Sequence, residues 1–115
     1  MRILGFSKKW DKLKNEEFTT FRFPRKDKDW FVGEVVQIFY KPRSKGGERL
    51  GTAKIRKQEG RQMLDWGALI NLTEDEAKTD GFASPNDMEM WLVKTYGVRR
   101  LYAERMNKLT LRWVE

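Results

Sequence analysis

The stretch that decides the fold class is TEDEAKTDGFASPNDMEMWLVKTYG, residues 73–97. Thr73 and Glu76 have the spacing of a capping box, in which the hydroxyl and the carboxylate each accept a hydrogen bond from a backbone N–H of the first helical turn. Gly81 is placed to end this helix. The Ser84–Pro85 pair then has the composition of a second helix start. We therefore predict two short helices joined by a tight turn.

The rest of the chain is rich in strand signals. Apolar or alternating runs predict strands at Arg2–Phe6, Phe18–Phe23, Trp30–Tyr40, Leu50–Lys57 and Lys108–Val114. Trp10–Lys14 fits one or two helical turns, and Gln62–Asn71 fits either a helix or a strand. Five or six strands with the helices predict an α+β fold, a small mixed β-barrel with two or three short helices packed on it. Residues 1–115 are expected to form a single domain.

The composition excludes several kinds of chemistry. The chain has no Cys and no His, so disulfides, thiolate nucleophiles, zinc clusters and Ser-His-Asp triads are ruled out. We expect no metal and no cofactor. No apolar run reaches the ~20 residues of a membrane-spanning helix. We therefore expect a cytoplasmic protein that does not enter a membrane. The sequence leaves the oligomeric state open, with a monomer favoured.

The charge is strongly positive and unevenly spread. The formal net charge is +7, with basic residues concentrated in residues 41–62 and acidic residues in residues 71–98. Segregated positive charge steers polyanions, whereas evenly spread charge serves mainly solubility. No basic amphipathic helix indicates a membrane surface. The predicted partner is nucleic acid, RNA rather than DNA, with a plain solubility role as the alternative.

The best candidate for a binding site is NEEFTTFR, residues 15–22. Strand alternation would place Thr20 and Arg22 on one face and Phe21 on the other. A hydroxyl beside a guanidinium suits an anion or a polar base. Thr19 has the same claim as Thr20, and a structural ion pair is an alternative role for Arg22.

At Thr20-Phe21-Arg22 and Asp80-Gly81-Phe82 the chain resembles the ASCH family of the PUA-like superfamily. The family motif Gly-x-Lys-x-x-Thr-x-Arg falls on residues 15–22, where the threonine and the arginine match and Glu17 replaces the lysine. The resemblance implies a PUA-like barrel, RNA binding, and a cleft lined by Glu17, Thr20, Arg22 and Asp80. In the structural alternative, Arg22 would pair with Asp80 or Glu17.

The resemblance also implies an alternative activity. Some members of the family are similar to hydrolases that remove the acyl group from acetylated cytidine nucleosides, and others to ribonucleases. The implied catalytic residues are Thr20 and Asp80, with Glu17 or Lys14. A carboxylate cannot both activate a threonine hydroxyl and stabilise an oxyanion as a lysine does. Binding is therefore favoured over catalysis.

Basic loops supply candidate contacts for a nucleic-acid backbone. The predicted contact residues outside the cleft are Arg25, Lys26, Tyr40, Arg43, Lys45 and Arg49. The alternative for residues 41–49 is a solvated hairpin tip. Trp10 and Trp30, which lie among charged residues, are candidate platforms for an unpaired base. The other three tryptophans, Trp66, Trp91 and Trp113, are expected in the core.

Overall fold

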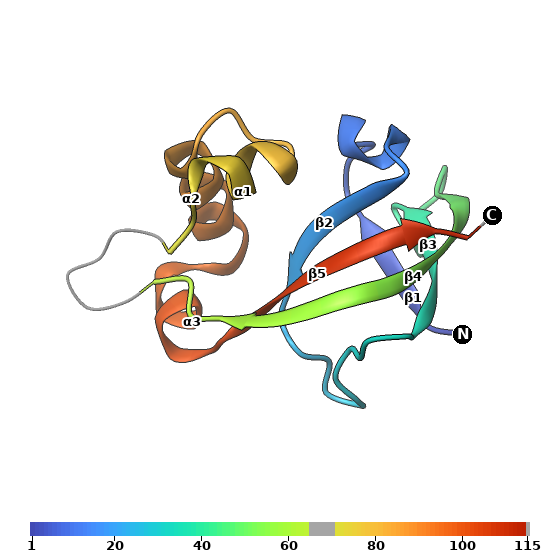
Figure 1. Cartoon of the computed structure of the whole chain (residues 1–115), viewed down its shortest axis with the longest axis horizontal. Coiled ribbons are helices and arrows are strands. Elements are labelled where there is room, and N and C mark those ends of the chain that lie inside the picture. Colours follow the sequence, from blue (N-terminus) through green and yellow to red (C-terminus); the bar gives the residue numbers. More distant parts are fainter. Residues whose placement is uncertain (65–70, 115) are drawn as a thin grey trace.

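A computed structural model describes residues 1–64 and 71–114. These residues form an α+β fold in which a curled five-strand mixed sheet makes a half-barrel beside three short helices (Figure 1). The elements in chain order are β1 (Ile3–Phe6), the 3-10 helix η1 (Asp11–Lys14), β2 (Glu17–Arg22), β3 (Val35–Tyr40), β4 (Glu48–Arg61), α1 (Glu74–Thr79), α2 (Pro85–Tyr96), α3 (Val98–Ala103) and β5 (Met106–Trp113). The predicted α+β class is confirmed, and the sheet is a partial barrel.

The order of strands in the sheet leaves β1 and β2 at its two edges. The order is β1-β3-β4-β5-β2, with β1 parallel to β3 and all other pairs antiparallel. The curl of the sheet brings the edges together through side chains, because the Phe6 ring of β1 lies 6.2 Å from the Phe18 ring of β2 between centroids. The candidate site lies between these two edges.

The core has two parts. The first fills the half-barrel and is built from residues such as Phe18, Ile38 and Leu111. The second lies between one end of the sheet and the helices, and it includes Met88 and Leu101. Figure 1 shows the three helices grouped on one side of the sheet, away from both termini. Among the described residues, every helix is too short or too polar to cross a membrane.

The two predicted helices are confirmed with their caps. Thr73 Oγ1 accepts from the backbone N–H of Glu76, and the Glu76 carboxylate accepts from the backbone N–H of Thr73, each at 3.1 Å. Ser84 caps α2 through the N–H of Asp87. The third helix, α3, follows directly after Gly97, whose φ is 88°. The sequence pattern does not predict α3, because a helix of six residues with one buried side chain, Leu101, is too short to show a repeating apolar face.

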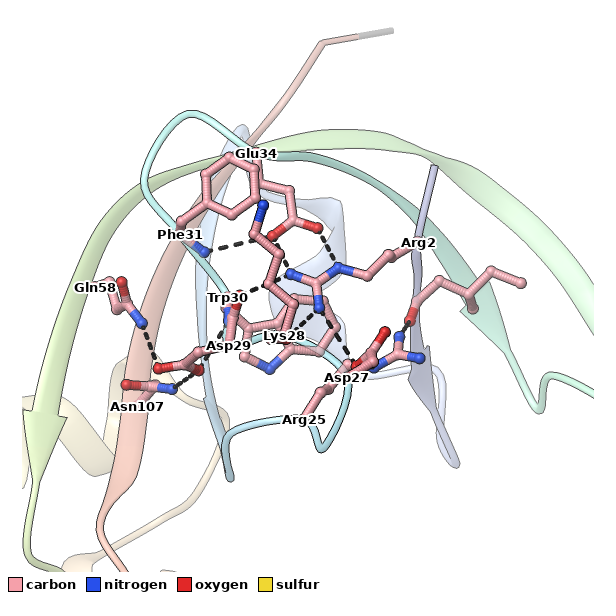
Figure 2. Close-up of polar contacts among 11 residues, drawn as sticks. Arg2, Arg25, Asp27, Lys28, Asp29, Trp30, Phe31, Glu34, Gln58 and Asn107 are labelled. Atoms are coloured by element: carbon pink, nitrogen blue, oxygen red, sulfur yellow. Dashed lines mark hydrogen bonds and ion pairs between the residues drawn. The ribbon is translucent and has the colours of Figure 1, made fainter.

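One predicted strand is too long at its start. β3 begins at Val35, whereas a strand was predicted from Trp30. Residues 31–34 form a turn instead, in which Gly33 has φ 93° and the N–H of Glu34 donates to the carbonyl of Phe31 at 3.1 Å. The Glu34 carboxylate is buried against Arg2, with Nε–Oε2 2.6 Å and Nη2–Oε1 2.5 Å (Figure 2).

The return strand is longer than predicted, because β4 runs to Arg61. The ambiguous segment Gln62–Asn71 and Trp66 lie largely or wholly outside the described residues.

Candidate functional site

A pocket of about 310 Å³ lies between the two sheet edges and α2. Its wall combines polar and charged groups with several aromatic rings. β1 and the residue after it contribute Gly5, Phe6 and Ser7; η1 and its cap contribute Trp10 and Lys12; β2 contributes Thr20, Phe21 and Arg22; and the helical region contributes Asp80, Phe82, Met88, Trp91, Leu92, Thr95 and Tyr96. Thr20, Arg22 and Asp80, three of the predicted cleft residues, therefore line one pocket.

Arg22 extends from the end of β2 into this pocket. Its Nε donates to Thr20 Oγ1 at 3.0 Å, and its guanidinium carbon lies 4.7 Å from the centre of the Phe6 ring. Burial lowers the pKa of Arg22 from its very high ordinary value, and an arginine stays protonated at neutral pH. Within residues 1–64 and 71–114, no carboxylate lies within ion-pair distance of Arg22. The guanidinium is therefore positively charged and open to an anionic or carbonyl group.

The ion pair in the pocket belongs to Asp80 and Lys12, not to Arg22. Asp80 caps the C-terminus of α1, and its Oδ1 lies 3.2 Å from Lys12 Nζ and accepts from Thr19 Oγ1 at 3.1 Å. Asp80 and Lys12 are 5% and 6% exposed. Burial raises the pKa of Asp80, opposed by Lys12, and it lowers the pKa of Lys12, opposed by Asp80. In the structural alternative for Arg22, its partner would be Asp80 or Glu17; the carboxylate of Asp80 instead forms its direct ion pair with Lys12, and it acts on Arg22 only as a nearby negative charge that opposes the lowering of the pKa of Arg22 by burial.

An aromatic cluster forms the wall next to this ion pair. The Trp10 ring lies 5.1 Å from Phe82 and 6.0 Å from Trp91 between centroids, and Phe82 lies 5.7 Å from Trp91. Gly81 is required here, because its φ is 108° and a Cβ would lie 2.9 Å from Trp10 Cε3. Trp10 is therefore part of the pocket wall and not a freely exposed platform.

Two predicted catalytic candidates lie outside the pocket wall. Glu17 is exposed at the start of β2. Lys14 is exposed too, and its Nζ lies 3.6 Å from Asp11 Oδ1. The lysine of this pocket is Lys12, which sequence analysis missed. The local sequence DKLK is mostly charged and gives no pattern that marks one lysine as buried, and Asp80 lies far away along the chain.

The predicted backbone-binding residues lie on two loops and on the ends of β3 and β4. Arg25 pairs with Asp27 at 3.2 Å and lies over Trp30, which is 5% exposed and so is no platform. Lys26, Arg43 and Lys45 are exposed, and among the described residues they have no carboxylate partner. Arg49 donates to Thr52 Oγ1 at 2.5 Å. Tyr40 is half-buried, with Lys9 and Lys41 over its ring.

The basic loop of residues 41–47 packs against β1, a strand that lines the pocket. The N–H of Lys41 donates to the carbonyl of Phe6 at 2.8 Å. A Cβ on Gly5 would collide with the Pro42 ring, so this loop packs closely against β1. Gly5 and Phe6 also line the pocket, so the exposed Arg43 and Lys45 belong to a loop that contacts one of its walls.

Comparison of the chain with models of protein families, with curated proteins and with solved structures finds no match. The geometry of the pocket is therefore the basis for a functional assignment. Aromatic rings can pack against a flat ligand and a guanidinium can donate to its oxygens, and both kinds of group line this pocket. Within the described parts of the chain, no group of three or more carboxylates gathers as a metal site would require.

Proposed function

We propose that this chain binds single-stranded nucleic acid, RNA in preference to DNA, and holds one nucleotide in the pocket. The observation that carries the proposal is the guanidinium of Arg22, which lies among aromatic walls and has no carboxylate partner in the described residues. Guanidinium groups donate to phosphate and carbonyl oxygens, and aromatic side chains stack on bases. At about 310 Å³ the pocket is near the lower end of the ~300–1,000 Å³ range of ligand sites, which suits a single nucleotide.

The surrounding charge supports the same partner. Arg43 and Lys45 extend from a loop that packs against the β1 wall of the pocket. Cations of this kind neutralise phosphates and release counterions when a strand binds. The half-barrel is consistent with the PUA-like fold that the ASCH resemblance implies, and the preference for RNA rests on that resemblance.

The test is an equilibrium titration of a fluorescently labelled single-stranded RNA at several salt concentrations. We expect the binding constant to fall steeply with salt, and Arg22→Gln to weaken binding at least about tenfold. Arg99→Gln is the matched control, because Arg99 is exposed on α3 and its loss changes the net charge equally. Equal effects of the two substitutions would show that the pocket does not hold the strand. A single-stranded DNA of the same sequence measures the preference for RNA.

A second candidate function is hydrolysis of an acylated cytidine nucleoside or of RNA. It is favoured by one observation, the burial of Lys12 in the pocket beside Asp80 at 3.2 Å. A lysine whose pKa is lowered by burial can act as a base. Lys12 would then do the work of the motif lysine, whose position Glu17 occupies in this chain, and the Thr20 hydroxyl would be the nucleophile.

This candidate predicts that the purified protein releases acetate from acetylcytidine or shortens RNA. Thr20→Ala should abolish turnover and leave the thermal unfolding temperature nearly unchanged, because within the described residues its hydroxyl takes part in one side-chain hydrogen bond, from Arg22. Thr110→Ala, on the neighbouring strand β5, is a control for the loss of a strand hydroxyl. Absence of turnover with both substrates would remove the hydrolase candidate and leave the binding proposal standing.

A further inference from the structure

The loop between β2 and β3 presents an apolar tip to solvent. Phe31 and Val32 are 42% and 58% exposed, although the residues on either side, Trp30 and Glu34, are 5% and 7% exposed. An exposed Phe beside an exposed Val at a loop tip leaves apolar surface hydrated. Neither residue lines the pocket described above.

The tip is held in place by the chain around it. Arg2 binds both oxygens of the Glu34 carboxylate, donates to the carbonyl of Asp29 at 2.9 Å and to that of Lys28, and lies 4.7 Å from the Trp30 ring (Figure 2). On the other side, Gly33 donates to the carbonyl of Ile55 at 2.8 Å. The backbone around Phe31 is thus held by hydrogen bonds, which lowers the entropy lost when a ligand packs on its ring.

The charges of this loop are arranged so that two of its three cations, Lys26 and Lys28, have no carboxylate partner among the described residues. The acidic groups are engaged: Asp27 pairs with Arg25 at 3.2 Å, and Asp29 accepts from Asn107 Nδ2 at 2.7 Å and from Gln58 Nε2 at 3.3 Å (Figure 2). Glu34 is paired with Arg2. By contrast, Lys26 and Lys28 have no carboxylate partner in the described part of the chain, and Lys28 Nζ lies 4.6 Å from the centre of the Phe31 ring.

The neighbouring strand adds to this positive surface. Arg56 follows Ile55, the residue of β4 that bonds through its backbone to Gly33 and Glu34. Its side chain is exposed and likewise has no carboxylate partner among the described residues. An exposed aromatic ring with a lysine beside it and an exposed arginine on the neighbouring strand is complementary to a base with its phosphate.

We propose that Phe31 is a stacking platform for a base of single-stranded nucleic acid, with Lys28 and Arg56 binding the adjoining phosphates. This second site rests on the proposed nucleic-acid binding but is separate from the pocket. Arg2, directly before β1, holds the platform, and Phe6 at the end of β1 lines the pocket. At ~3.3 Å per residue, the four steps from Arg2 to Phe6 separate these backbone positions by roughly 13 Å. A strand of several nucleotides can therefore reach both sites, whereas a mononucleotide occupies only one.

The experiment compares a labelled single-stranded RNA of about 12 nucleotides, within the ~4–16 nucleotide range of small single-strand-binding folds, with uridine monophosphate. We expect Phe31→Ala to weaken binding of the RNA about 5- to 150-fold, because stacking contributes ~1–3 kcal/mol per base. Binding of the mononucleotide should not change. Phe31→Tyr, which keeps an aromatic face, should retain affinity, whereas Phe31→Leu, which is apolar without one, should not.

Four outcomes overturn the platform. If Phe31→Ala leaves the affinity for RNA unchanged while Arg22→Gln lowers it, the platform is wrong and the pocket proposal stands. If Phe31→Leu retains full affinity, the contact is apolar and not stacking. If the wild-type protein binds neither RNA nor mononucleotide, both proposals fall. If it binds vesicles of phosphatidylserine and phosphatidylcholine through Phe31 but does not bind RNA, the tip is a membrane contact instead.

Discussion

Replacing Glu76 by Gln tests how α1 is attached to the sheet. The Glu76 carboxylate accepts from Arg61 Nη1 at 3.0 Å and Nη2 at 2.8 Å, from Lys108 Nζ at 2.9 Å, and from the N–H of Thr73 at 3.1 Å. The hydrogen bonds from Arg61 are the largest cause of its low pKa, about 2 compared with an ordinary 4.5. A single side chain on α1 is therefore tied to both β4 and β5.

The pKa of Glu76 gives the size of the expected loss in folding stability. A fall from 4.5 to about 2 corresponds to about 3 kcal/mol at 1.36 kcal/mol per unit, and screening by solvent around the partly exposed Arg61 reduces this to about 2 kcal/mol. Because the folded-state pKa is lowered, this stability is fully present above pH 4.5. It is lost as the pH falls toward about 2. Glu76→Gln removes the charge and keeps the size of the side chain.

Urea unfolding followed by tryptophan fluorescence measures the effect at several pH values. We expect Glu76→Gln to lower the free energy of unfolding by about 2 kcal/mol near neutral pH, and by progressively less as Glu76 is protonated in the wild type. Glu74→Gln is the control on the same helix, because Glu74 pairs with Lys78 at 3.1 Å on the surface and should cost below about 0.5 kcal/mol. A loss for Glu76→Gln that does not change with pH would refute the electrostatic explanation.

Three further changes have definite expected results. Gly81→Ala should lower the free energy of unfolding by about 1–3 kcal/mol, because φ is 108° and the new Cβ would lie 2.9 Å from Trp10. The thermal unfolding temperature should fall accordingly, and an unchanged melting curve would contradict this. Lys12→Met should lower the free energy of unfolding, measured with denaturant, by about 3–5 kcal/mol, because Asp80 is left buried without its partner. Adding Asp80→Asn should recover part of that loss. Arg2→Ala should speed amide hydrogen exchange in residues 28–34, with exchange in α2 unchanged as the internal reference.

The helices could be predicted in detail because their signals are local. The capping box of Thr73 and Glu76 and the cap at Ser84 act over three residues, so the sequence contains both partners. The start of β3 was mispredicted for the opposite reason. Residues 30–36 have strand-like composition, but the chain turns at Gly33. The Glu34 carboxylate that follows is bound by Arg2, which lies far away in the sequence, so this contact cannot be seen in the local pattern.

The candidate site was predictable in part. Strand alternation placed Thr20 and Arg22 together, and both line the pocket with Asp80. The partner of Asp80 was not predictable, because Lys12 lies in a single turn of 3-10 helix whose sequence resembles a solvated segment. Which lysine is buried depends on how η1 packs against the C-terminus of α1, and that contact is made only in the folded chain.

The position of β2 at the edge of the sheet has a consequence for the order in which the site is assembled. In the described sheet, the one strand that pairs with β2 is β5, nearly the whole chain away. Closing so long a loop is slow and entropically unfavourable, so this pairing is expected late in folding. During synthesis on the ribosome, Thr20 and Arg22 emerge early but gain their neighbouring strand only once residues 106–113 have been made. A nascent chain therefore cannot complete this pocket until β5 has been added.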